Sequence, residues 1–176
     1  EADIETCILD NPPIFLPYLN GERAPIWNPD ARGVFFGISG QCEKCHLAYS
    51  VMEGIVFSLY HIYTQLLAEG RALVVTGGAA KNRTLNTLKA ELFGMPVRTL
   101  KENDTSAMGV VMLAGVGNGL FDDLESAAHS LCKTDTVIYP TGAYRDILLK
   151  RFELYKKLYP SLEALFTEKE NLTGGR

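Results

Sequence analysis

The sequence predicts an α/β domain in which helices flank a sheet. Two short apolar runs come first, over residues 14–19 and 34–38, and a long segment of helical periodicity follows over residues 43–70. After it, strand-like and helix-like segments alternate, an order that is typical of layered α/β folds. A glycine pair, Gly77-Gly78, joins one of these strands to the helix that follows it.

The first two strands are expected to be short. Residues 1–13 are polar, end in a proline pair and are interpreted as an irregular lead-in segment. Pro17 cannot donate a backbone hydrogen bond, so residues 14–19 are expected to form an edge or interrupted strand. Turn-forming residues fill positions 20–33, and the second strand follows over residues 34–38.

The segment over residues 43–70 is predicted to be one long helix. Its apolar residues recur at steps of three and four, and Gly70 is a typical residue just past a helix end. Because the helix is apolar around most of its girth, we expect other elements to cover it on more than one side. Glu53 lies among these apolar residues, and we expect a structural carboxylate, paired with Arg23 or a loop N–H, in preference to a catalytic one.

Residues 71–93 are the stretch that points to a ligand. The run from Ala72 to Val75 is wholly apolar, which predicts a strand buried on both faces. The glycine pair after it has no Cβ to block a flat or phosphorylated ligand, and a helix start there would offer unpaired N–H groups. A tight turn that needs positive φ and binds nothing remains the alternative. The helix carries an apolar stripe, and four charged residues are expected off it: Lys81, Arg83, Lys89 and Glu91.

The rest of the chain continues the alternation. A short strand is predicted over residues 97–100, and a helix of small residues, capped by Asp104 or Thr105, over residues 106–116. Three further elements are predicted: a short helix within residues 120–131 capped by Asp122 or Asp123, an extended segment over residues 137–140, and an amphipathic helix over residues 144–159. Residues 167–176 are expected to be a disordered tail.

Composition limits the class of protein. The chain has 176 residues, of which 47% are hydrophobic and 22% charged, with a net charge of −4. This is typical of a soluble globular domain, and the acidity argues against nucleic acid or an anionic membrane as a partner. No apolar run is long enough to span a bilayer, and the polar start is unlike a signal peptide. A cytoplasmic location with free thiols is therefore expected.

Other chemical motifs are weak. The run from Cys42 to His46, CEKCH, matches the c-type haem attachment pattern, but nothing indicates export, and zinc would need two further ligands at partner spacing. We interpret the run as the first turn of the long helix, with two incidental thiols. The dinucleotide fingerprint, the P-loop and the G-x-S-x-G nucleophile elbow do not occur.

Several segments, in order along the chain, resemble the FGGY carbohydrate kinases. One stretch resembles the second family signature: it begins with GVFFGI at residues 33–38, continues for seven residues and ends with HLAYSVME at 46–53. FLPYLNGERAP at residues 15–25 resembles the family's FLPYL-GER-P segment. GGAAKN at residues 77–82 resembles its adenine-site turn, and TSAMG at 105–109 resembles its EATALG-like helix start. The likeness runs from about Ile14 to Phe166.

The resemblance implies an actin-like, ribonuclease H-like ATPase domain, with a mixed sheet flanked by helices and truncated at its start. Residues 1–166 would be most of the family's C-terminal, nucleotide-binding domain. The implied activity is ATP-dependent phosphorylation of a hydroxyl of a sugar, polyol or sugar acid, and Trp27 inclines the reading to xylulose or gluconate. The implied nucleotide contacts are the backbone of Gly77, Gly78 and Ala79 and the side chain of Asn82.

The chain also departs from the family pattern. The D-x-G-T phosphate loop, the G-x-x-D-Q segment with the catalytic Asp, and the threonine-glycine loop are not found, and Thr76 replaces the first glycine of the usual triplet. We therefore expect no catalytic residue in this chain, and an inactive fragment of an enzyme that uses ATP and Mg²⁺. The alternative is a non-catalytic actin-like binding module. Expected partners are ATP and a small sugar or sugar acid, without nucleic acid or membrane; a homodimer is left open.

Overall fold

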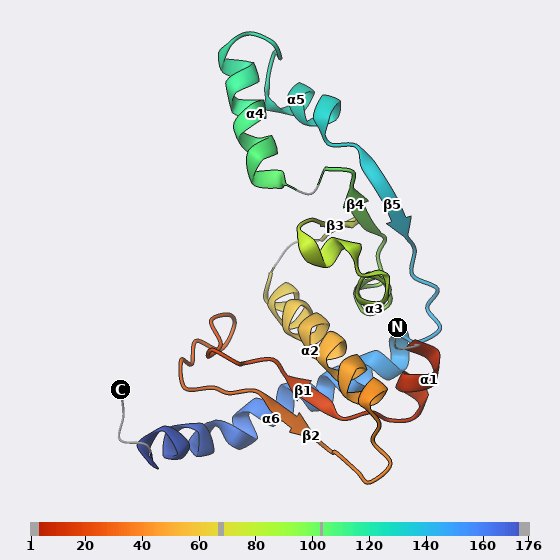
Figure 1. The fold of residues 1–176 in the computed structure, drawn as a ribbon, viewed down its shortest axis with the longest axis vertical. Coiled ribbons are helices and arrows are strands. Elements are labelled where there is room, and N and C mark those ends of the chain that lie inside the picture. Colours follow the sequence, from red (N-terminus) through yellow and green to blue (C-terminus); the bar gives the residue numbers. More distant parts are fainter. Residues whose placement is uncertain (1–3, 67–68, 103, 173–176) are drawn as a thin grey trace. The chain divides into compact units, whose positions relative to one another are not determined.

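The computed structural model describes residues 4–66, 69–102 and 104–172, and these residues form two compact units. The first unit comprises Glu1–Glu69, Glu91–Phe93 and Thr141–Arg176. The second comprises Gly70–Ala90 and Gly94–Pro140. The chain therefore leaves the first unit after the long helix, returns to it briefly at Glu91–Phe93, and returns again for the terminal helix (Figure 1).

The first unit is built from a two-stranded sheet and helices. Strand β1 (Ile14–Leu16) pairs antiparallel with β2 (Val34–Phe36), with Leu16 opposite Val34. The strand ends directly before Pro17, as the missing N–H of proline requires. Both α2 (Lys44–Gln65) and α6 (Arg145–Leu172) contact β1, so the prediction that the long helix is covered by other elements is confirmed.

Aromatic rings form the core of the first unit. Phe57 on α2 lies 5.6 Å from Phe152 and 5.4 Å from Tyr155 on α6, measured between ring centroids. A Cβ on Gly54 would collide with the carbonyl oxygen of Phe15, so only glycine lets β1 lie this close to α2. Sequence periodicity located this helix, and the ring contacts explain why its aromatic residues are needed.

Several boundaries differ from the sequence prediction. The lead-in segment contains a helix, α1 (Ile4–Leu9), and α2 ends at Gln65 instead of near Gly70. Helix α6 passes through Pro160 to Leu172, so the predicted disordered tail is helical over 167–172, and its last four residues lie outside the described part. The physical reason is burial: Phe166 is 6% exposed and stacks on Tyr159 with the ring centroids 6.3 Å apart.

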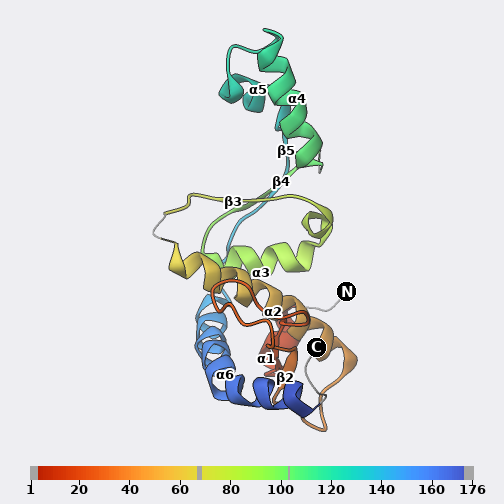
Figure 2. The same cartoon turned by 90° about the vertical axis from the view of Figure 1, so that its left-hand side faces the viewer.

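The second unit holds a mixed three-stranded sheet. Its strands β3 (Leu73–Val75), β4 (Val97–Leu100) and β5 (Thr134–Ile138) lie in that order, and Figure 2 labels all three in a second view. Strand β3 runs parallel to β4, and β5 runs antiparallel to it. The accompanying helices are the short 3-10 helix η1 (Gly78–Lys81), α3 (Arg83–Phe93), α4 (Thr105–Gly117) and α5 (Leu124–Leu131). The predicted α/β class, a mixed sheet flanked by helices, is confirmed.

One expectation about β3 is wrong. The strand was predicted to be buried on both faces, but Val74 is 60% exposed, and β3 is an edge strand of the three. Helix α4 is likewise apolar and exposed, with Val110 at 66% and Leu113 at 62%. These faces lack a cover within the described part of the second unit.

Among the described helices, none has the length and apolar character that a membrane crossing requires.

Candidate functional site

The glycine pair lies in a tight turn at the end of β3. Gly77 has φ +76° and ψ −171°, a conformation that is essentially restricted to glycine. The 3-10 helix η1 follows and is closed by hydrogen bonds from Ala80 N to Gly77 O and from Asn82 N to Ala79 O, each 3.1 Å long. The sequence predicts that an α-helix follows the glycine pair directly, and this is wrong. The 3-10 helix η1 lies between them, and α3 begins only at Arg83.

The two glycines differ in what they require. A Cβ on either would meet no heavy atom within 4 Å, so the backbone faces open space. The positive φ explains Gly77 as a turn residue. Gly78 has neither a positive φ nor a close neighbour, and so the turn alone gives no reason for glycine there. An uncovered backbone at Gly78 is suited to a flat ligand that lies directly against it.

Asn82, another predicted contact residue, caps α3. Its side-chain Oδ1 accepts a hydrogen bond of 2.9 Å from Leu85 N, and its carbonyl oxygen accepts one of 3.1 Å from Asn86 N. This is the usual role of asparagine at a helix start. The cap fixes the orientation of the Asn82 side chain beside the turn, and its contact with a ligand remains a prediction.

Two buried polar residues behind the turn escaped the sequence analysis. Asn86 is 1% exposed, and its Nδ2 donates to the carbonyl oxygen of Ala80 at 2.7 Å. Lys89 is 5% exposed, and its Nζ donates to Asn86 Oδ1 at 3.4 Å. Burial lowers the pKa of Lys89. The expectation that Lys89 lies off the buried face is thus wrong; steps of four and three from Asn82 place all three side chains along one side of α3.

The sheet topology brings a second helix start to the same edge. Because β3 and β4 are parallel, the turn after β3 and the segment after β4 leave from the same edge of the sheet. The latter segment leads to α4, where Asp104 Oδ1 accepts from Ala107 N at 3.0 Å and confirms one of the two predicted caps. Ligands of open α/β sheets bind outside the carboxyl ends of parallel strands. The candidate site is therefore this edge, with Gly77, Gly78 and Ala79 at its centre.

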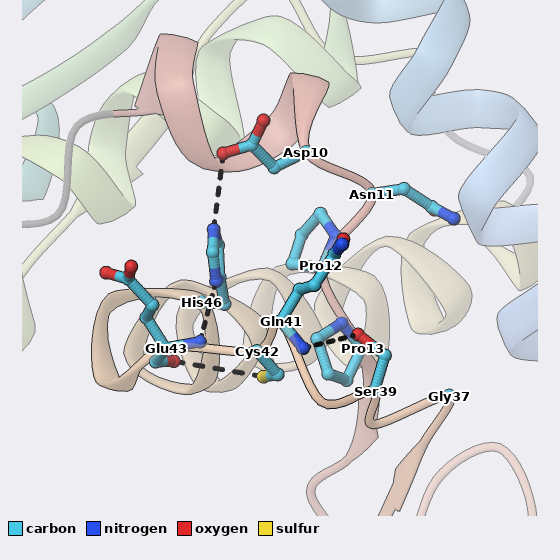
Figure 3. A pocket seen from close by; sticks show the side chains of 10 residues that line it. All are labelled: Asp10, Asn11, Pro12, Pro13, Gly37, Ser39, Gln41, Cys42, Glu43 and His46. Atoms are coloured by element: carbon cyan, nitrogen blue, oxygen red, sulfur yellow. Dashed lines mark hydrogen bonds and ion pairs between the residues drawn. The ribbon is translucent and has the colours of Figure 1, made fainter.

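A separate polar pocket of about 300 Å³ lies in the first unit and contains part of the CEKCH run (Figure 3). Glu43 N donates to His46 Nδ1 at 2.9 Å, so the ring proton sits on Nε2, which faces Asp10 Oδ2 at 3.3 Å. Cys42 Sγ lies 3.8 Å from the carbonyl oxygen of Glu43. These contacts fix the first turn of α2. Within the described ranges no group of three or more His, Cys, Asp or Glu side chains could hold a metal ion.

Comparisons with known proteins concern the chain as a whole. A family model described as "FGGY family of carbohydrate kinases, C-terminal domain" matches residues 3–117. A xylulose kinase of Staphylococcus epidermidis is 36% identical over 163 residues, which are 91% of this chain and 32% of that protein.

Two solved structures resemble the fold. The ligand-bound xylulose kinase from Lactobacillus acidophilus matches with a TM-score of 0.83 and 32% identity, over 93% of this chain and 35% of that one. The gluconate kinase from the same organism matches with a TM-score of 0.82, the same identity and the same coverage. The chain thus spans about a third of the length of the relatives it matches.

Proposed function

This chain belongs to the FGGY family of carbohydrate kinases, as part of the C-terminal domain, and we propose on that premise that it supplies the nucleotide-binding part of an ATP-dependent kinase. The complete kinase, meaning the longer protein that contains this chain, phosphorylates a hydroxyl of a sugar, polyol or sugar acid. Xylulose and gluconate are the first candidates, because relatives with these names cover nearly the whole chain.

The observation that carries this proposal is the uncovered backbone at Gly78. Neither conformation nor packing demands glycine at this position, whereas an adenosine lying against the backbone would. In the proposed complex, the backbone of Gly77, Gly78 and Ala79 contacts adenosine and the nearest phosphate. Asn82 lies at the N-terminus of α3 beside them and contributes a hydrogen bond to the nucleotide.

The contribution of this chain to phosphoryl transfer is to bind and orient the nucleotide. Transfer depends on positioning and on charge stabilisation by Mg²⁺. The acceptor hydroxyl's base and the metal-holding carboxylates belong to the rest of the complete kinase.

The exposed apolar faces of the second unit fit the same proposal. More than half of the surface of three apolar residues is exposed: Val74 on β3, and Val110 and Leu113 on α4. Exposed apolar patches usually mark a surface that another part of a protein covers. In the complete kinase, another part of the protein covers them. The chain by itself should therefore bind ATP weakly and phosphorylate nothing, because it supplies only one side of the cleft.

Replacement of Gly78 with Val in the complete kinase tests the proposal. The added side chain meets no neighbour within 4 Å, so the fold should persist, while the space for adenosine is filled. The KM for ATP, read from ADP release, should rise at least tenfold, and the KM for the sugar should stay within about twofold. Gly40→Val is the matched control, since Gly40 also lacks positive φ and close neighbours but lies in the first unit. An unchanged ATP affinity in Gly78→Val would refute the site.

A further inference from the structure

We propose that Asn86 is a positioning residue for the nucleotide turn: its buried amide holds the Ala80 carbonyl and so sets the orientation of the backbone from Gly77 to Ala79. This inference rests on the proposed function. It assigns a role to a residue that touches no ligand and acts only through the turn.

The geometry ties the amide to the turn itself. Asn86 Nδ2 donates to Ala80 O at 2.7 Å across six residues, the shortest of the hydrogen bonds that hold η1 and α3 together at this point. Ala80 is 6% exposed, so its carbonyl is fixed on the inner side while Gly77 and Gly78 face open space. A 3-10 turn has poorer hydrogen-bond geometry than an α-helix. An external donor at its third residue therefore fixes a segment that is weakly held by itself.

Lys89 decides which way the amide points. An ammonium group only donates, so the Asn86 atom facing Lys89 Nζ at 3.4 Å must be the oxygen. The nitrogen then faces Ala80 O, which only accepts. The Asn86 amide group can therefore take only one orientation, with its oxygen towards Lys89 Nζ and its nitrogen towards Ala80 O.

Burial of this pair is costly and needs a reason. Burial lowers the pKa of Lys89, and the 3.4 Å contact with Asn86 is weak compensation for a charged group at 5% exposure. Asparagine is also a poor residue for a helix interior. Two apolar side chains at these positions would pack without such penalties. What the polar pair adds is a fixed direction for one carbonyl behind the ligand-facing turn.

The test compares three substitutions in the complete kinase. Asn86→Leu removes both hydrogen bonds at similar volume, and Asn86→Asp keeps a partner for Lys89 but presents only acceptors to Ala80 O. Both should raise the KM for ATP on the order of tenfold and leave the KM for the sugar within about twofold. Thr87→Val is the matched control: Thr87 Oγ1 also donates to a backbone carbonyl, of Arg83 at 3.0 Å, but is exposed on the same helix. It should leave the KM for ATP unchanged.

A measurement on the unsubstituted kinase keeps the test independent of folding in the variants. The side-chain amide protons of Asn86 should be protected from solvent exchange in NMR spectra and should shift on addition of ADP. A folded Asn86→Asp with wild-type KM for ATP, or an unprotected amide that ADP does not shift, overturns the inference. If Gly78→Val weakens ATP binding and the Asn86 variants do not, only the positioning role fails; if neither has an effect, the nucleotide site itself fails.

Discussion

Arg151 donates to both carboxylate oxygens of Glu53, at 2.7 Å from Nε to Oε1 and 2.7 Å from Nη2 to Oε2. The two side chains are 8% and 1% exposed. The same guanidinium donates to Asn11 Oδ1 at 3.0 Å and to Pro12 O at 2.8 Å. Burial opposes the charge of Arg151, but its hydrogen bonds with Glu53 more than offset this and its pKa is raised. One cation therefore joins α2, α6 and the segment before β1.

Removal of this cation should destabilise the chain strongly. Arg151→Met leaves the buried Glu53 carboxylate without a cation, with only the Tyr49 hydroxyl at 3.4 Å from Oε1 as a donor, and should lower the free energy of unfolding by about 3–5 kcal/mol, measured by urea denaturation. The double variant Glu53→Leu with Arg151→Met should recover part of this loss, because no buried charge remains. If Glu53→Gln were fully stable but abolished turnover in the complete kinase, Glu53 would be a catalytic residue and the structural assignment would be wrong.

Gly54 should not tolerate a methyl group. A Cβ there would collide with the Phe15 carbonyl, and so Gly54→Ala should lose about 1–3 kcal/mol through displacement of β1 from α2. Gly109→Ala is the control, since Gly109 lies inside α4 with no neighbour within 4 Å. Alanine in an open helix interior should stabilise by about 0.5–1 kcal/mol. Equal thermal unfolding temperatures for the two variants would contradict the packing described here.

The two glycines of the turn should differ in their response to alanine. Gly77→Ala forces a Cβ into φ +76° and should cost about 1–3 kcal/mol, although no atom blocks it. Gly78→Ala has no such conflict and should stay within about 0.5 kcal/mol of the parent. Chemical denaturation of both variants measures the difference. A Gly77→Ala variant as stable as Gly78→Ala would show that the turn relaxes out of the left-handed region.

Alkaline pH should lower the stability that the Tyr18–Tyr155 pair provides. This pair joins the segment after β1 to α6. Tyr18 and Tyr155 share a hydrogen bond of 2.9 Å between their hydroxyl groups, and burial raises the pKa of Tyr18 from 10.0 to about 12. Between these two values the folded state binds more protons than the unfolded state, so stability should fall as pH rises through that window. Urea unfolding at a series of pH values measures the slope. Tyr18→Phe should show a shallower fall, and a slope equal to the parent's would count against the burial of Tyr18.

Local patterns predicted the elements well and the exposure of their residues less well. Apolar runs located β1 to β4, because strand-forming residues bounded by prolines and glycines leave few alternatives. The prediction of exposure was wrong where a residue's hydrogen-bond partner lies far away in the sequence. Glu91, expected off the buried stripe, is 1% exposed because it accepts hydrogen bonds from Thr141 N at 2.6 Å and Gly142 N at 3.0 Å. No local spacing could indicate a partner fifty residues away.

The candidate site shows the same division. Gly77 and Gly78 could be predicted from the sequence, because a residue without a Cβ by itself indicates a turn or a close approach of a ligand to the backbone. Asn86 and Lys89 were missed, since two polar residues on a helix ordinarily indicate an exposed face, and only the folded turn reveals the Ala80 carbonyl that they serve. Arg151 was missed as the partner of Glu53 for the reason that applies to Glu91: the two residues are 98 positions apart.

The central claim is that the backbone of Gly77, Gly78 and Ala79 forms one wall of a nucleotide site. A crystal structure of the complete kinase with ADP tests it most directly. We predict that the adenosine lies against these three residues, with no side chain between it and the backbone of Gly78. An adenosine bound elsewhere on the protein, with this turn still facing solvent, would contradict the account.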